Sequence, residues 1–294
     1  MGSEHEPWDR EQLDLEYSPS SRVDDMQAYL REYAKRSARV RATLPWTEHA
    51  YGPAPAQRLD FFPVAAPGAP LLVYVHGGYW QELSKEDSCF AAPDFVARGI
   101  AFAALGYGLV PAHRLDEIVA MVRDGVRWLR TNAAWLGVDP GRIFLSGSSA
   151  GAHLVAMCLL DGSLSPPLPS PLPPPLPPSD LIRGAVLLSG VYELEPLRRT
   201  YVGEAIGLTV EEASRNSPIR QLRGPLPPLI VARGGNETAA FADQHDRFVR
   251  AVTAIGSTVT DLVVEPRNHF DLPFDLGDPA SPLGRATLAR LASR

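Results

Sequence analysis

One short stretch, residues 142–154 (RIFLSGSSAGAHL), constrains the fold more than any other part of the chain. Its apolar start predicts a buried strand, and the small and apolar residues at its end predict a helix. Between them lies the pattern G-x-S-x-G, formed by Gly147, Ser149 and Gly151. A serine on such a tight strand-to-helix turn is exposed, and the flanking glycines let neighbouring backbone pass close to it. We therefore predict that Ser149 is a nucleophile; the alternative is a turn with a purely structural role.

The rest of the chain predicts a regular alternation of strands and helices. Two short extended segments, 48–51 and 57–62, precede a continuous apolar run at 71–75 that is typical of a central parallel strand. Further strands are expected at 100–105, 184–188, 229–232 and 258–264, and helices near 84–99, 114–135, 240–254 and 282–292. This order predicts the α/β class, with a mostly parallel, doubly wound sheet and helices on both faces. We expect a single domain, residues 1–294.

An N-terminal extension, residues 1–45, precedes the sheet and contains one predicted helix. The helix is expected to begin at Ser21, with Asp24 in the capping-box position. Four apolar residues recur on one face at helical spacing: Val23, Met26, Leu30 and Tyr33. This face should cover something apolar, either the active site or the edge of the sheet.

Two later segments interrupt the alternation. Residues 163–180 are expected to form a loop insertion, because their proline-rich run fits neither a helix nor a central strand. A structural, polyproline-like loop is favoured over a peptide ligand, since no basic residue flanks the run. Residues 192–223 predict an irregular, partly helical cap.

Composition limits the partners and the location of the protein. The net charge of −6 is spread over interspersed acidic and basic residues, which argues against binding to nucleic acid or to a membrane surface and favours a small-molecule substrate. The N-terminus has no apolar signal core and no run is long enough to span a bilayer, so we expect a cytoplasmic protein. Cys89 and Cys158 lack metal-ligand spacing, and no metal or organic cofactor is expected. A homodimer remains open.

A nucleophilic serine needs a base, and the base needs a carboxylate to orient it. For this kind of turn the partners follow in the order serine, acid, histidine, on loops after late strands. Of the seven histidines, His269 alone lies in a loop after the last predicted sheet strand and is the predicted base. Glu237, in the loop after strand 229–232, is the predicted acid. Asp243, one turn into the following helix, is the alternative.

Acyl transfer also needs hydrogen-bond donors for the oxyanion that develops on the substrate. Gly77 and Gly78 follow the predicted central strand and expose backbone N–H groups with no side chain in the way. We predict an oxyanion hole formed by the N–H groups of Gly77, Gly78, Tyr79 and Ala150, the residue after the nucleophile.

The motif His76-Gly77-Gly78-Tyr79-Trp80 resembles the oxyanion motif of the kynurenine formamidases (arylformamidases), a family with the α/β-hydrolase fold. Other segments similar to the family are YSPS at 17–20, SGVY at 189–192, SPI at 217–219, NHF at 268–270 and PASPL at 279–283. The resemblance covers nearly the whole chain. It implies the α/β-hydrolase fold, with Ser149 as nucleophile, His269 as base and Glu237 as acid. Glu237 departs from the animal enzymes, which place Asp there.

The resemblance also implies a reaction, the hydrolysis of N-formyl-L-kynurenine to kynurenine and formate. His269 would then protonate the aryl amine as it leaves. Tyr79, Trp80 and Phe270 are expected to form an apolar wall for the aromatic ring, unless they are ordinary core aromatics. Two other functions stay open: a carboxylesterase of the same fold that acts on small acyl esters, and a catalytically inactive binding module that keeps the fold.

Overall fold

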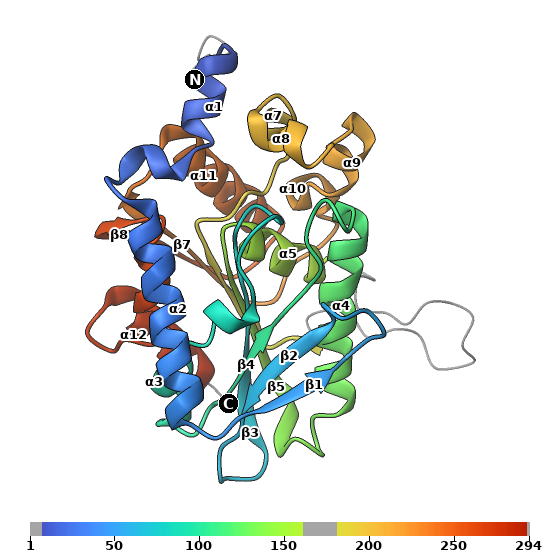
Figure 1. Ribbon diagram of the computed structural model, residues 1–294, viewed down its shortest axis with the longest axis vertical. Helices are drawn as coiled ribbons and strands as arrows, with labels where there is room; N and C mark the ends of the chain where they lie inside the picture. Colours follow the sequence, from blue (N-terminus) through green and yellow to red (C-terminus); the bar gives the residue numbers. More distant parts are fainter. Residues whose placement is uncertain (1–7, 161–180, 293–294) are drawn as a thin grey trace.

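The computed structural model describes residues 8–160 and 181–292, and its centre is an eight-stranded sheet with the strand order β1-β2-β4-β3-β5-β6-β7-β8 (Figure 1). The strands are β1 (Thr47–Ala50), β2 (Arg58–Phe62), β3 (Ala69–Val75), β4 (Ala101–Leu105), β5 (Val138–Ser148), β6 (Gly184–Leu188), β7 (Leu229–Asn236) and β8 (Val259–Asn268). β1 and β2 pair antiparallel, as does β2 with β4, and the other neighbours pair in parallel. The expected α/β class is therefore confirmed. The proline-rich insertion expected at 163–180 lies outside the described residues.

The register of the sheet brings the ends of distant strands together. Val75, the last residue of β3, pairs with Gly147 near the end of β5. Asn236, at the end of β7, pairs with Asn268 at the end of β8. Because parallel strands end at the same edge, the loops that follow β3, β5, β7 and β8 meet there.

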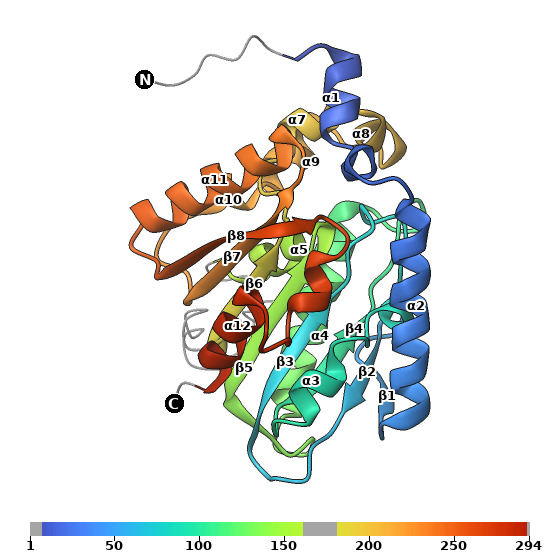
Figure 2. The ribbon, with the colours of Figure 1, turned by 90° about the vertical axis from the view of Figure 1, so that its left-hand side faces the viewer.

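Two layers of helices cover the sheet, and residues of β3 alternate between them (Figures 1 and 2). Leu71, Val73 and Val75 pack in one core with α4 (Leu115–Thr131), α5 (Ala150–Cys158) and α11 (Ala239–Ala254). Leu72 and Tyr74 pack in the other with α2 (Met26–Thr43), α3 (Ala92–Val96) and α12 (Pro282–Ala292). Successive side chains of a strand point to opposite faces of the sheet, so alternate residues of β3 enter alternate cores. Because both faces are buried, β3 is apolar throughout.

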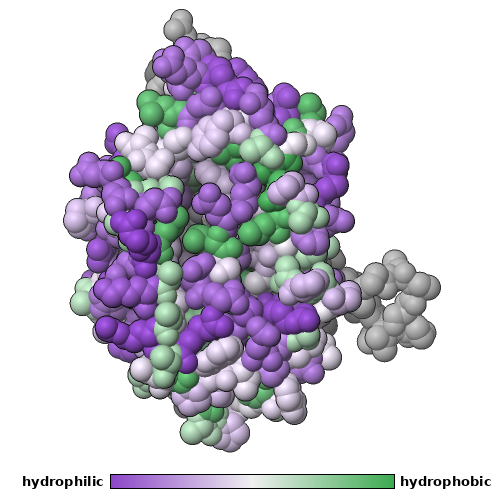
Figure 3. Space-filling model, in the orientation of Figure 1, coloured by the Kyte–Doolittle hydropathy of each residue, from purple (hydrophilic) through white to green (hydrophobic). Residues whose placement is uncertain are grey.

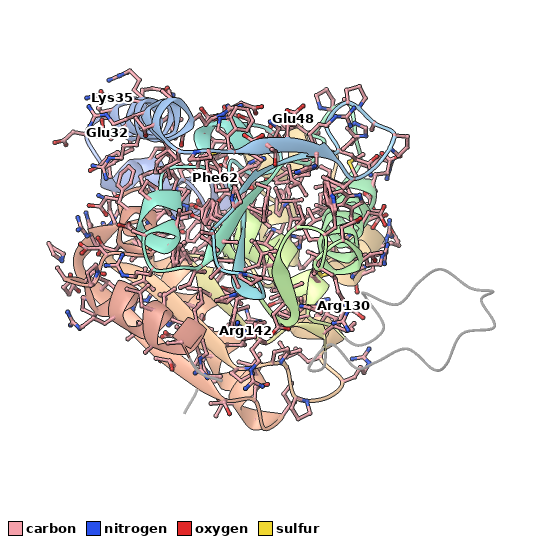
Figure 4. The ribbon with its side chains drawn as sticks, turned by 90° about the horizontal axis from the view of Figure 1, so that it is seen from below. Glu32, Lys35, Glu48, Phe62, Arg130 and Arg142 are labelled. Atoms are coloured by element: carbon pink, nitrogen blue, oxygen red, sulfur yellow. The ribbon has the colours of Figure 1, made fainter. Side chains whose placement is uncertain are left out.

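The N-terminal extension is more structured than expected. A short helix, α1 (Arg10–Glu16), comes first, and a 3-10 turn (Pro19–Arg22) follows it. The expected start of the next helix at Ser21 is wrong, because α2 begins at Met26 and Asp25 is its N-cap, accepting a hydrogen bond from the Ala28 N–H. Seen from below, Glu32 and Lys35 lie on the outer side of α2 (Figure 4).

The segment after β3 also differs from expectation. Instead of one helix over 84–99, it contains a 3-10 turn (Lys85–Asp87) and the short α3. The two are separated at Cys89, whose N–H donates to Ser37 Oγ on α2. Lys85 is buried beside Asp60, with 2.8 Å between Nζ and Oδ1. These tertiary contacts hold the chain outside a continuous helix.

The cap expected at 192–223 consists of four short helices. They are α7 (Glu195–Arg198), α8 (Tyr201–Ala205), α9 (Val210–Arg215) and α10 (Pro218–Gln221). Hydrophobic residues form small groups among hydrophilic ones on the face shown in Figure 3.

Among the described residues, no helix has the length and apolar character that crossing a membrane requires.

Candidate active site

Ser149 lies at the junction of β5 and α5 in a left-handed backbone conformation, with φ 57° and ψ −119°. Such a conformation is strained for a serine and is held only by its surroundings. A Cβ at Gly147 would lie 2.4 Å from the carbonyl carbon of Gly151, and one at Gly151 would lie 2.0 Å from the Val75 oxygen. Both glycines of the motif are therefore required by the close approach of backbone, and the serine lies at the sheet edge.

His269 and Glu237 are neighbours because their strands pair up to the preceding residues, Asn268 and Asn236. His269 Nδ1 lies 3.1 Å from Glu237 Oε2, and both side chains are buried. This bond orients the imidazole and leaves its other nitrogen, Nε2, for proton transfer.

The second oxygen of the Glu237 carboxylate is also bound. Oε1 accepts hydrogen bonds from Ser189 Oγ and from the Gly234 N–H, each at 2.6 Å. Burial raises the pKa of the Glu237 carboxyl, but the hydrogen bonds from His269, Ser189 and Gly234 outweigh it, and the pKa lies below its ordinary value. Glu237 is therefore held as a carboxylate despite its burial.

Ser189 is a functional candidate that sequence reasoning missed. It follows β6 at the same sheet edge, with φ 48°, a conformation uncommon for any residue but glycine. The available signal was a polar residue directly after a buried strand, in the segment SGVY that resembles the family.

The alternative acid, Asp243, does not contact His269. It is exposed on α11, where its Oδ2 lies 3.5 Å from Arg247 Nη1. Among the other described histidines, His153 bonds to the Asn216 carbonyl oxygen, and His245 to Asp261. Within the described chain, His269 and Glu237 are thus the histidine and carboxylate that meet at this edge.

The loop after β3 lies directly beside the strand-to-helix turn at Ser149. A Cβ at Gly77 would come within 2.8 Å of the Ser148 carbonyl oxygen and 3.2 Å of Ser149 Cβ. Gly78 has φ +94°, and a Cβ there would lie 2.2 Å from the Glu82 carbonyl oxygen. Only glycine fits either position, so the backbone of this loop can approach a group bound at Ser149.

The three aromatic residues expected at the pocket have different environments. Tyr79 and Phe270 line the cavity beside Ser149. The expectation for Trp80 is wrong: it is fully buried, does not line the cavity, and packs edge-on against His153 with 5.0 Å between ring centroids. The large indole is stabilised in the core, where it belongs to the apolar cluster around α5.

A cavity of about 330 Å³ opens above Ser149 and His269. Five residues of the N-terminal extension line it: Pro19, Ser20, Met26, Leu30 and Tyr33. The extension thus covers the cavity, and Val40 on α2 also packs in the core on one face of the sheet, so the two roles considered for this helix do not exclude each other. Figure 2 shows α1 and the following turn lying across the end of the sheet, near α8.

The extension is hydrogen-bonded to three loops at this edge of the sheet, those after β3, β7 and β8. Tyr79 Oη donates to the Tyr17 carbonyl oxygen at 2.7 Å. Thr238 Oγ1, next to Glu237, donates to the Glu16 carbonyl oxygen at 2.6 Å. These bonds connect the extension to the glycine loop and to the acid loop.

The histidine loop is tied in the same way. Asn268 Nδ2 donates to Tyr29 Oη at 3.0 Å, and Tyr33 Oη donates to the Phe270 carbonyl oxygen. Tyr29 also stacks on Phe270, with ring centroids 5.8 Å apart. The extension is therefore part of the wall and of the support of the site.

No three His, Cys, Asp or Glu side chains in residues 8–160 and 181–292 are grouped as metal ligands. Both cysteines are buried. What the described groups can do together is nucleophilic acyl transfer, with a serine, a histidine–carboxylate pair and glycine backbone at one cavity.

Comparison with known proteins gives a consistent result. The family model BD-FAE matches residues 61–165. The chain is 32% identical to a kynurenine formamidase of Danio rerio over 283 residues, covering 92% of each chain. It is 28% identical to Esterase LipC of Mycobacterium tuberculosis, covering 76% of this chain and 59% of that one. A solved structure of a putative thioesterase from a Silicibacter species matches with a TM-score of 0.79 and 28% identity, over 94% of this chain and 99% of that one.

Proposed function

Because the chain belongs to the kynurenine formamidase family and has the α/β-hydrolase fold, we propose that it hydrolyses aryl formamides such as N-formyl-L-kynurenine. At the coarser level it is a hydrolase of the formamidase or esterase type. The observation that carries the finer proposal is the 32% identity to a kynurenine formamidase over 92% of each chain. The buried pair His269 and Glu237, 3.1 Å apart beside the cavity that Ser149 lines, supports hydrolysis by a serine nucleophile.

In the proposed reaction, Ser149 Oγ attacks the formyl carbon of the substrate. His269 takes the serine proton, and the Glu237 carboxylate stabilises the imidazolium that forms. The oxyanion that develops on the substrate is stabilised by donated hydrogen bonds. The donors are the backbone N–H groups of Gly77, Gly78, Tyr79 and Ala150. Losing one such donor typically costs about 3 kcal/mol of transition-state stabilisation.

The tetrahedral intermediate then collapses, and the C–N bond breaks as His269 donates the proton taken from Ser149 to the leaving aryl amine. Water, deprotonated by His269, attacks the formyl ester on Ser149. This step releases formate and restores the serine hydroxyl. Phe270 and Tyr79 provide an apolar wall against which an aryl ring packs.

A carboxylesterase for small acyl esters is the second candidate. Its support is the 28% identity to Esterase LipC and the shared fold. The same serine, histidine and carboxylate would serve both reactions, since each passes through an acyl-enzyme and an oxyanion.

A substrate panel distinguishes the two. Initial rates with N-formyl-L-kynurenine and with p-nitrophenyl acetate are measured for the wild type and Ser149→Ala. We expect efficient, Ser149-dependent formamide hydrolysis. Turnover of the ester alone would replace the proposal with an esterase, and a folded protein that a fluorophosphonate does not label at Ser149 would point to an inactive binding module.

A further inference from the structure

The charges around the cavity point to how it selects among formamides. We propose that the cavity favours leaving groups that are neutral or cationic and disfavours those that carry a net negative charge. The inference rests on the proposed function, because it concerns the amine half of the same substrate.

The described residues that line the cavity include two acidic residues, Glu82 and Asp87, and no lysine or arginine. Its histidines are His269, which is paired with Glu237, and His76. Burial lowers the pKa of His76 to about 4, so this imidazole is neutral at pH 7. The lining therefore has no permanent positive charge.

The catalytic pair does not change this balance. Glu237 lies behind His269 and is a carboxylate, as its lowered pKa indicates. When His269 takes the serine proton, the imidazolium is compensated by Glu237. An anionic leaving group would thus lose water and gain no counter-ion, which is unfavourable in a partly buried site.

The remaining walls suit a cation or a neutral ring. Tyr33 stacks on Phe90 with ring centroids 5.2 Å apart, and both line the cavity together with Phe270. Aromatic faces attract cations and pack against apolar rings. Asp87 is held in place by Ser84, whose Oγ donates to Oδ2 at 2.8 Å.

The polar groups that could meet a carboxylate in the cavity are neutral. Ser20, Gln81 and Ser88 line it and offer hydrogen bonds without charge. For a zwitterion such as N-formyl-L-kynurenine, we expect the ammonium group to lie toward Asp87 and the carboxylate to stay in water. The net charge of the leaving group should then govern kcat/KM.

Four compounds with the same formanilide group test this. They are the carboxamide of N-formylkynurenine (cationic), 2-formamidoacetophenone (neutral), N-formyl-L-kynurenine (zwitterionic) and 4-(2-formamidophenyl)-4-oxobutanoate (anionic). At low salt we expect kcat/KM for the anionic compound to be at least about tenfold below that of the neutral and cationic ones. The difference in kcat/KM between the anionic compound and the other two should become smaller in high salt, which screens the charges. An anionic compound cleaved within about twofold of the neutral one would overturn the inference.

Charge-neutralising variants identify the residues responsible. In Glu82→Gln/Asp87→Asn, kcat/KM should rise for the anionic compound and fall for the cationic one, so that their ratio changes by at least about tenfold. Turnover of the neutral compound reports whether the machinery is intact, and Asp87→Asn alone should show part of the change. Asp246→Asn, an exposed change of the same charge on α11, should leave the ratio unaltered. An unaltered ratio in the double variant would refute the assignment.

The failure of each proposal can be recognised separately. If formamides are cleaved without a charge order, the inference fails and the proposed function stands. If no formamide is cleaved, the proposed function fails, and the acetate esters of tyramine and of 4-hydroxyphenylacetate then test the charge preference. Their phenol leaving groups are similar, so faster cleavage of the cationic ester supports the inference and equal rates reject it.

Discussion

The hydroxyl of Ser189 donates a hydrogen bond to the carboxylate of Glu237, with 2.6 Å between Oγ and Oε1. The same carboxylate accepts from the Gly234 N–H and binds His269 through its other oxygen. Ser189 is itself held by the sheet, since its N–H donates to the Ala232 carbonyl oxygen at 2.8 Å. The acid is therefore fixed from three neighbouring strand ends.

Removing this hydroxyl should weaken the orientation of the base. For Ser189→Ala we expect kcat to fall about tenfold, the equivalent of one hydrogen bond to a charged group. The bond favours the charged form of Glu237, so its loss raises the pKa of that carboxyl, and the acid limb of the kcat profile should move to higher pH. Ser257→Ala, which removes another buried hydroxyl bonded to the Leu226 N–H, is the control. An unchanged acid limb would show that Ser189 is only structural.

Ser149 and His269 should act as one unit. We expect Ser149→Ala and His269→Ala each to lower kcat by about four to six orders of magnitude. The kcat of the double variant should lie within about tenfold of that of the less active single variant. Single-turnover kinetics with the best formamide check this. Losses that multiply would mean that the two residues do not share a catalytic step.

The choice of acid is tested by two isosteric changes. Glu237→Gln should lower kcat by about three to four orders of magnitude, less than loss of Ser149, because the imidazole keeps a partner but loses its charge compensation. Asp243→Asn should change kcat by less than about twofold, since Asp243 is exposed and pairs with Arg247. Steady-state rates of both variants decide, and a larger loss in Asp243→Asn would reverse the assignment.

The support by the N-terminal extension is tested at Tyr79. Tyr79→Phe removes the bond to the Tyr17 carbonyl oxygen, and we expect kcat to fall about three- to tenfold, because the glycine loop loses one tether. Tyr51→Phe removes a similar bond, to the Gly106 carbonyl oxygen, and serves as the control. The melting temperature of both variants is recorded with the rates. Equal kcat values in the two would argue that the tether does not serve catalysis.

Two buried histidines should make the stability of the fold depend on pH. Burial lowers the pKa of both His76 and His153 from 6.5 to about 4. As the pH falls from about 6.5 to 4, the unfolded chain binds protons that the folded chain does not, so the free energy of unfolding falls, by about 1.4 kcal/mol per pH unit for each proton. Urea unfolding between pH 7 and 4 measures the slope. In His153→Gln the dependence of the unfolding free energy on pH should lose the contribution of one proton. An equal slope in this variant and in the wild type would exclude His153 as a contributor.

Much of the fold follows from local patterns. The G-x-S-x-G turn, the apolar run of β3 and the amphipathic helices are specified by residues close together in the sequence, and α12 has the predicted bounds. Local patterns specify helix starts less completely. Ser21 and Asp25 are both residue types that cap helices, but Ser21 lies within the 3-10 turn and Asp25 is the N-cap of α2.

The sequence by itself determined the strand-turn-helix at Ser149 and the glycines beside it, because steric requirements act over a few residues. His269 and Glu237 were predicted from their places after late strands, but the pairing of β7 with β8 was needed to show that Glu237, and not Asp243, contacts His269. Only the tertiary structure decided that Ser189 supports Glu237, that Trp80 is buried, and that the extension covers the cavity. Those contacts join residues far apart in the chain, 48 positions for Ser189 and Glu237. They arise from the strand order and register, which no local pattern contains.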